Sequence, residues 1–164
     1  MRGGVLVAGI GNIFQTDDAF GVEVANRLGE RDLPDGVRVE DFGIRGVHLA
    51  YELLEGYEGL ILIDAMPMGE PPGTVAIVEP DALTINEAGP VVDAHTMSPD
   101  VVLATLAGLG GNVDWIRVVG CQPASLQEGM GLTPPVEAAV EGAVEVCCQL
   151  VAEIVEPAGK GTRE

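Results

Sequence analysis

The residues of this sequence that are best suited to chemistry are two adjacent acids, Asp17 and Asp18, which follow a short apolar run expected to form a strand. A second apolar run ends on Asp64, and His95 stands in a loop before another expected helix. The carboxyl ends of parallel strands meet at one edge of a sheet, where open α/β folds bind ligands. We therefore expect Asp18, Asp64 and His95 to converge there. Two carboxylates and an imidazole can bind a divalent metal ion and leave coordination positions open, as catalytic and sensing sites do.

Each of these residues also has a purely structural interpretation. Acids in the first turn of a helix complement its macrodipole, which alone would explain Asp17 and Asp18. Asp64 could cap a turn, and His95 could be a hydrogen-bonded loop histidine. Adjacent carboxylates repel each other unless a cation or a proton lies between them. We therefore expect Asp17 to cap or brace the loop, which leaves Asp18 to point into the cleft.

Alternating apolar strands and helices predict a doubly wound α/β fold: a single-domain, three-layer sandwich with a twisted, mostly parallel sheet of about five strands between helices. The expected strands cover 4–10, 37–41, 60–64, 74–78 and 115–119. The expected helices cover 18–30, 47–54, 98–109 and 134–154, the last with Thr133 as its N-cap. We expect residues 1–155 to form the domain and the polar residues 156–164 to form a flexible C-terminal tail.

The composition excludes several classes of partner. With 26 acidic and 8 basic residues the chain has a formal charge of −18, which argues against nucleic acid and anionic membranes and favours cationic partners. No run reaches the roughly 18 apolar residues that a membrane span needs, and the N-terminus is not that of a secretory signal. Three cysteines without a C-x-x-C spacing indicate a reducing compartment. We expect a cytoplasmic protein and a monomer.

Two other motifs suggest different chemistry. Gly9 and Gly11 after a strand resemble a dinucleotide fingerprint, but its third glycine position is occupied by Phe14, and a phosphate would meet two carboxylates. The glycines would instead allow the backbone to turn sharply and to approach a ligand or another strand closely. Cys121 ends an expected strand and could suggest a thiol protease. No histidine adjoins it in sequence, so we expect a structural role, with residues 122–126 lining a peptide cleft.

The chain resembles the hydrogenase maturation proteases, the endopeptidases that finish the large subunit of nickel–iron hydrogenases. The resemblance covers about residues 4–154 and rests on Gly9-Ile10-Gly11-Asn12 with Asp17-Asp18-Ala19-x-Gly21, Ile63-Asp64-Ala65, His95-x-x-Ser98-Pro99, Gly120-Cys121-Gln122-Pro123-Ala124-Ser125-Leu126 and Gly131-Leu132-Thr133-Pro134. Two positions depart from the family pattern. Asp18 stands where many members carry glutamate, and Phe42 and Ile44 interrupt a loop that is often Asp-Gly-Gly-Thr.

The resemblance implies that the protein removes the C-terminal extension of a hydrogenase large-subunit precursor after nickel insertion. It implies that Asp18, Asp64 and His95 bind this nickel, which the substrate supplies, and we expect the same residues to be catalytic. No permanent organic cofactor is expected. The residues expected to line the substrate cleft are Gly11, Asn12, Asp41 and Gln122. An alternative is a chaperone that checks the same precursor for nickel without cutting it, and a second alternative is a nucleotide-binding enzyme.

Overall fold

The structure is a computed structural model that describes residues 4–79 and 99–155. As the sequence predicted, the sheet has five strands, and their order is β2-β1-β3-β5-β4. Four neighbouring strands are parallel, and β4 runs antiparallel to β5 at one edge. The strands are β1 (Val5–Ile10), β2 (Val37–Gly43), β3 (Gly59–Ala65), β4 (Val75–Val78) and β5 (Trp115–Cys121).

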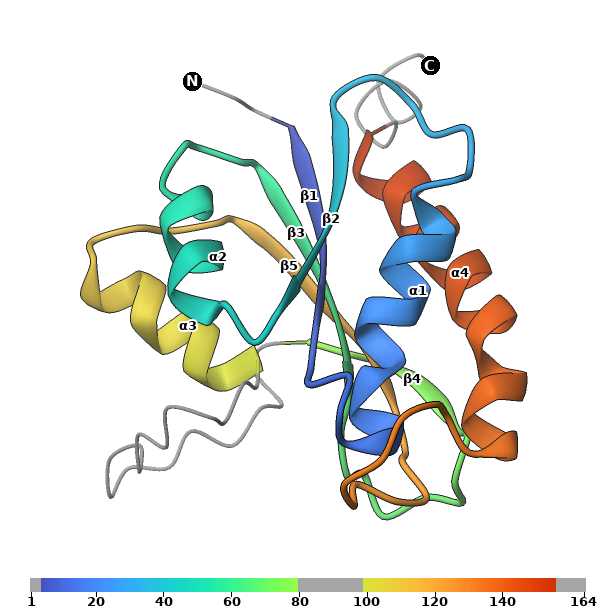
Figure 1. Cartoon of the computed structure of the whole chain (residues 1–164). Coiled ribbons are helices and arrows are strands. Elements are labelled where there is room, and N and C mark those ends of the chain that lie inside the picture. The colour runs from blue at the N-terminus through green and yellow to red at the C-terminus, as the bar shows by residue number, and fades with distance from the viewer. Residues whose placement is uncertain (1–3, 80–98, 156–164) are drawn as a thin grey trace.

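Helices cover both faces of the sheet and complete the predicted three layers (Figure 1). The helices are η1 (a 3-10 turn, Thr16–Ala19), α1 (Phe20–Leu28), α2 (Gly46–Leu53), α3 (Pro99–Gly108) and α4 (Pro134–Val155). In Figure 1, α1 and α4 lie together on one face, and α2 and α3 lie on the other. Within the described ranges, no helix has the length and apolar character that a membrane crossing requires.

Strand periodicity divides the apolar residues between two cores. In β1, Val5 and Val7 belong to the core beneath α1 and α4, whereas Leu6, Ala8 and Ile10 belong to the core beneath α2 and α3. Successive side chains of a strand point to opposite faces, so a strand buried on both sides is apolar throughout. This explains why the central strands read as continuous apolar runs.

Two glycines let α1 lie unusually close to the sheet. A Cβ atom on Gly9 of β1 would overlap the backbone oxygen of Gly21 in α1, and a Cβ on Gly21 would overlap the backbone oxygens of Ile10 and Ile63. The close approach at Gly9 was expected toward a ligand or another strand, but it is made to helix α1. It brings the start of α1, and the acids of η1 before it, against the carboxyl ends of β1 and β3.

The element boundaries differ from prediction mainly at the carboxyl edge of the sheet. The helix expected at 18–30 begins as the 3-10 turn η1 and becomes α-helical only at Phe20. Strand β2 continues past Asp41 to Gly43, and β5 continues to Cys121. These extensions place Asp41 inside a strand, opposite Gly9 of β1. The predictions for His95, Ser98 and the tail at 156–164 lie outside the described residues.

Candidate functional site

Two of the predicted site residues meet at the carboxyl edge of the sheet. Asp64 is the penultimate residue of β3, the strand between β1 and β5, and Asp18 lies in η1 after the end of β1. The backbone amide of Asn12 donates a hydrogen bond of 2.8 Å to the Asp18 carboxylate and orients it. Asp64 is 2% exposed, and its Oδ1 atom has no hydrogen-bond partner within the described ranges. The edge therefore holds a buried acid with unused coordination capacity.

The electrostatics of this pair favour a positive charge or a proton. Burial raises the pKa of Asp64 well above its ordinary value, and the nearby carboxylates of Asp18 and Asp100 raise it further. Burial also raises the pKa of Asp18, which the hydrogen bond from Asn12 partly opposes. Asp100 is the second residue of α3 and was not predicted as part of the site. Its position in the first turn of α3, five residues after His95 in the sequence, was the signal that could have indicated it.

The third predicted ligand, His95, lies outside the described residues, so its convergence with the two acids stays a prediction. Within residues 4–79 and 99–155, no group of three or more histidine, cysteine, aspartate or glutamate side chains is arranged to hold a metal ion. The described part of the site thus supplies carboxylates, which suit a divalent cation, and leaves the imidazole of the predicted set untested.

Asp17 has a different role from its neighbour. Its fully buried carboxylate accepts hydrogen bonds from the backbone amides of Ala124, Ser125 and Thr133 and from the Thr133 hydroxyl. Burial by itself would raise the pKa of Asp17, but these hydrogen bonds outweigh it and lower the pKa below the ordinary value. Asp17 therefore acts as a brace, one of its two expected roles, but the segment that it holds, residues 124–133, was not predicted. The Thr133 hydroxyl binds this carboxylate, whereas the sequence predicted Thr133 as an N-cap of α4.

The loop before η1 is tied to the same distant segment by its backbone. Gly129 donates its amide to the Phe14 oxygen at 2.9 Å, and Thr16 donates its amide to the Gly129 oxygen at 2.9 Å. Thr16 has a φ of 54°, the left-handed region that a β-branched residue rarely adopts. These bonds hold Thr16 in that conformation and fix the loop that leads to Asp18 in η1.

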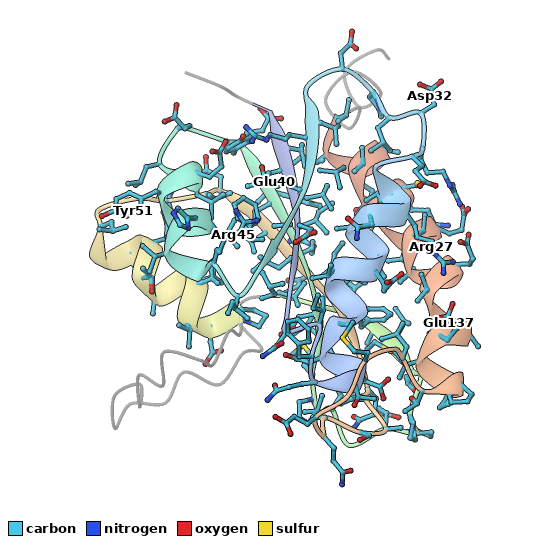
Figure 2. All side chains as sticks on the ribbon, viewed as in Figure 1. Arg27, Asp32, Glu40, Arg45, Tyr51 and Glu137 are labelled. Atoms are coloured by element: carbon cyan, nitrogen blue, oxygen red, sulfur yellow. The ribbon has the colours of Figure 1, made fainter. Side chains whose placement is uncertain are left out.

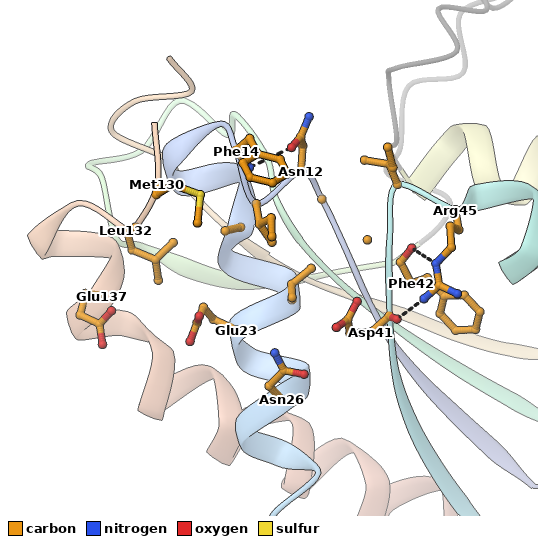
Figure 3. A pocket seen from close by; sticks show the side chains of 17 residues that line it. Asn12, Phe14, Glu23, Asn26, Asp41, Phe42, Arg45, Met130, Leu132 and Glu137 are labelled. Atoms are coloured by element: carbon orange, nitrogen blue, oxygen red, sulfur yellow. Dashed lines mark hydrogen bonds between the residues drawn. The ribbon is translucent and has the colours of Figure 1, made fainter. Parts of the chain in front are cut away.

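A groove of about 650 Å³ opens beside the acid pair (Figure 3). It is bounded by the 11–14 loop, one face of α1, the end of β2 with the loop that follows, and the 130–132 segment with Glu137 of α4. Three of the four predicted cleft residues line it, namely Gly11, Asn12 and Asp41. Asp18 and Asp64 do not, but Asn12 both lines the groove and hydrogen bonds Asp18. The groove is therefore separated from Asp18 by the backbone at Asn12.

The fourth predicted cleft residue, Gln122, lies elsewhere. Its side-chain oxygen accepts hydrogen bonds from the backbone amides of Met68 and Glu70, so it holds the loop between β3 and β4. Sequence reasoning also missed Phe14, Glu23 and Met130 as groove residues. Large apolar residues in loops next to the motif glycines were the available signal for Phe14 and Met130.

The cysteines have no features of a nucleophile. Cys121 is fully buried, and this burial, together with the charge of Asp17, raises the pKa of its thiol to about 11. Cys147 is also buried, Cys148 is half-buried, and all three are free thiols. A cysteine nucleophile acts as a thiolate, usually with a lowered pKa. The structural role expected for Cys121 fits this environment.

Comparisons with known proteins identify a family. The family model HycI, hydrogenase maturation protease, matches residues 22–150. A hydrogenase 2 maturation protease from Escherichia coli K12 is 37% identical over 146 residues, which is 86% of each chain. The hydrogenase expression/formation protein HoxM of Azotobacter vinelandii is 34% identical over 98% of this chain and 79% of its own length.

Solved structures give the same result. The hydrogenase maturating endopeptidase HybD from E. coli superposes with a TM-score of 0.73 at 34% identity, covering 92% of this chain and 93% of its own. A solution structure of an endopeptidase from E. coli gives a TM-score of 0.77 at 35% identity with the same coverage. The sequence and structure comparisons thus lead to one conclusion: the chain belongs to the hydrogenase maturation protease family and is an endopeptidase.

Proposed function

We propose that this endopeptidase removes the C-terminal extension of a nickel-loaded large-subunit precursor of a nickel–iron hydrogenase. In this proposal Asp18, Asp64 and His95 bind the nickel that the precursor carries. The observation that carries the proposal is the buried Asp64 carboxylate, whose Oδ1 has no hydrogen-bond partner in the described part of the chain and whose pKa Asp18 helps to raise. A buried carboxylate without a full set of hydrogen bonds needs a positive partner, and a divalent cation brought by the substrate would be that partner.

If enzyme and precursor bind the ion together, the enzyme can discriminate nickel-loaded from nickel-free precursor. Carboxylate and imidazole donors alone do not select nickel, because copper binds such sets more tightly along the Irving–Williams order. Selectivity would then come from the way the precursor itself holds the metal. A precursor without nickel would lack part of its docking energy, and a tenfold preference requires only about 1.4 kcal/mol.

Two chemical routes fit these residues. Nickel bound to the substrate could polarise the scissile carbonyl or lower the pKa of a bound water molecule. Alternatively, a carboxylate could act as a general base toward free water. Asp64 is the candidate for that second role, because burial and Asp18 raise its pKa and so make its carboxylate a stronger base.

The test is incubation of the purified protein with matched nickel-loaded and nickel-free precursors, followed by mass spectrometry. We expect a C-terminal mass loss in the loaded precursor only. Asp64→Asn and His95→Ala should abolish this loss while their circular dichroism spectra stay close to that of the wild type. Full processing by either variant would overturn the metal-site assignment, and binding of the loaded precursor without any mass loss would support the chaperone alternative.

We also propose that the protein is a cytoplasmic monomer. Its three cysteines are all free thiols, which suits a reducing compartment. A sedimentation experiment at working concentration would test the monomer, since a dimer would sediment at twice the mass.

A further inference from the structure

The groove beside the acid pair has exposed apolar side chains on its walls. Phe14 is 59% exposed and Met130 is 70% exposed, and Ile13 and Ile44 are also exposed at the same groove. Large apolar side chains gathered at a concave surface are unusual for a protein surface and mark a binding site. Figure 3 shows Phe14 and Met130 next to each other on one wall.

This apolar wall is assembled before any partner binds. The hydrogen bonds between Gly129 and the backbone of Phe14 and Thr16 join the two loops that carry Phe14 and Met130. Asp17 anchors the same 124–133 segment, because its carboxylate accepts four hydrogen bonds from that segment. A wall held in this way binds without the entropic cost of ordering two loops, which favours affinity.

The remaining surface of the groove is acidic and largely without cationic partners. Glu23 of α1 and Asp41 of β2 lie on opposite sides of the same space in Figure 3, and neither has an ion pair among residues 4–79 and 99–155. The third acid, Glu137, pairs with Arg27 at 3.1 Å. Arg45 lines the groove, but its guanidinium donates to the backbone oxygens of Asp41 and Phe42.

We propose that this groove binds a segment of the protein substrate in which a large apolar side chain lies close to a lysine or arginine. The apolar residue would pack against Phe14 and Met130, and the cation would lie between Glu23 and Asp41. Because Asn12 both lines the groove and orients Asp18, a chain held here would lie next to Asp18, on the other side of the Asn12 backbone. The inference rests on the proposed function and adds to it the part of the substrate that is recognised.

Charge and composition favour this occupant over the alternatives. A second copy of the protein carries the same net charge of −18 and would be repelled by the acidic groove. The chain's own residues 156–164 contain Lys160 and Arg163 but no large apolar side chain to fill the wall. A volume of about 650 Å³ accommodates a few side chains of a peptide.

The charge component is tested with two double variants that remove the same number of acids. Glu23→Gln with Asp41→Asn changes the groove, and Glu30→Gln with Asp32→Asn changes exposed acids after the end of α1. We expect the groove variant to raise the Kd for the nickel-loaded precursor, and the KM for its processing, roughly three- to tenfold. Its binding should also depend less on ionic strength, while the control variant stays close to the wild type.

The apolar component is tested with two aromatic residues of similar exposure. Phe14 is 59% exposed in the groove, and Tyr51 is 54% exposed on α2, on the other side of the sheet (Figure 2). Phe14→Ala should weaken precursor binding about fivefold, because the variant lacks the apolar surface that the phenyl group would bury in the complex. Tyr51→Ala should leave the Kd unchanged.

The outcomes separate this inference from the proposed function. If the wild type binds the precursor but does not cut it, the proposed function fails, and the Kd values of the variants still decide the role of the groove. If the wild type cuts the precursor and the groove variants match their controls in Kd and KM, the groove inference is wrong. Tighter precursor binding by Lys160→Glu with Arg163→Glu would show that the tail occupies the groove, which also overturns it.

Discussion

The carboxylate of Asp17 accepts hydrogen bonds from both the backbone amide and the hydroxyl of Thr133, each at 2.7 Å, although 116 residues separate the two in sequence. Asp17 lies in η1 directly before Asp18, and Thr133 directly precedes α4. The pair therefore fixes the position of Asp18 relative to the 130–132 segment, which lines the groove. A buried contact of this kind serves stability and site geometry together.

Replacement of Asp17 by asparagine should destabilise the protein by roughly 2–4 kcal/mol, because an amide cannot accept all the hydrogen bonds that the carboxylate receives. Urea unfolding at neutral pH measures this loss. Asp32→Asn, which removes an exposed acid, should change the free energy of unfolding by less than about 0.5 kcal/mol. Equal effects of the two substitutions would contradict the bracing role of Asp17.

Acidification should remove the contribution of Asp17. Its pKa in the folded protein is below the ordinary 3.8, so the unfolded state binds the proton more readily than the folded state. The stabilisation is then fully present above that ordinary value and is lost as the pH falls through the lowered folded pKa. The stability difference between wild type and Asp17→Asn should therefore shrink in strongly acidic solution, and a difference independent of pH would contradict this assignment.

Gly21 should be intolerant of any side chain. A Cβ there would overlap the backbone oxygens of Ile10 and Ile63, so Gly21→Ala should cost about 3 kcal/mol or more and move η1 away from β3. Gly142 in α4 has open space around its Cα, so Gly142→Ala should stabilise the protein by roughly 0.5–1 kcal/mol. Thermal unfolding of both variants checks the pair. Similar melting temperatures would mean that α1 does not depend on this close approach.

Cys121→Ala should retain precursor processing, because burial and the charge of Asp17 raise the pKa of the Cys121 thiol to about 11 and leave almost no thiolate at neutral pH. Treatment of the wild type with iodoacetamide should likewise leave processing intact, with Cys148 as the more accessible thiol. Loss of activity in the alanine variant at unchanged melting temperature would instead support a cysteine nucleophile.

The sequence predicted the sheet and the meeting of Asp18 and Asp64 because both follow from local pattern. Apolar runs define the strands, and parallel strands bring their carboxyl ends to one edge. The long helix α4 was predicted almost to the residue, since proline marks its start and an apolar stripe runs along it. An acid that directly follows an apolar run can therefore be placed at the carboxyl edge of the sheet from its local sequence alone.

The groove could not be predicted in the same way. Phe14 and Met130 come from loops more than a hundred residues apart, and the hydrogen bonds of Gly129 and Asp17 bring these loops together. Loops have no periodicity that reveals which segments will pair. Gln122 shows the converse case, because a polar residue in a motif at a strand end was expected in the cleft but hydrogen bonds a neighbouring loop.

Asp64→Asn should abolish processing and yet raise the stability of the free protein. Burial and two neighbouring carboxylates raise the pKa of Asp64 well above 3.8, so the folded state binds the proton more tightly than the unfolded state. Wild-type stability then falls as the pH rises from about 3.8 to the folded pKa, and the deficit persists above it. Asparagine carries no charge, so the gain at neutral pH should be roughly 1–3 kcal/mol.

Urea unfolding of wild type and Asp64→Asn across the acidic to neutral range checks this prediction, with Asp32→Asn as a control for loss of an exposed charge. The gain should be small at low pH and should grow as the pH rises, because only the wild type then carries a buried negative charge. A variant less stable than the wild type at neutral pH would mean that a cationic group already balances Asp64 in the free protein. The acid edge would then have no need of the positive charge that we propose the substrate's nickel supplies, and the proposed recognition of nickel would lose its main support.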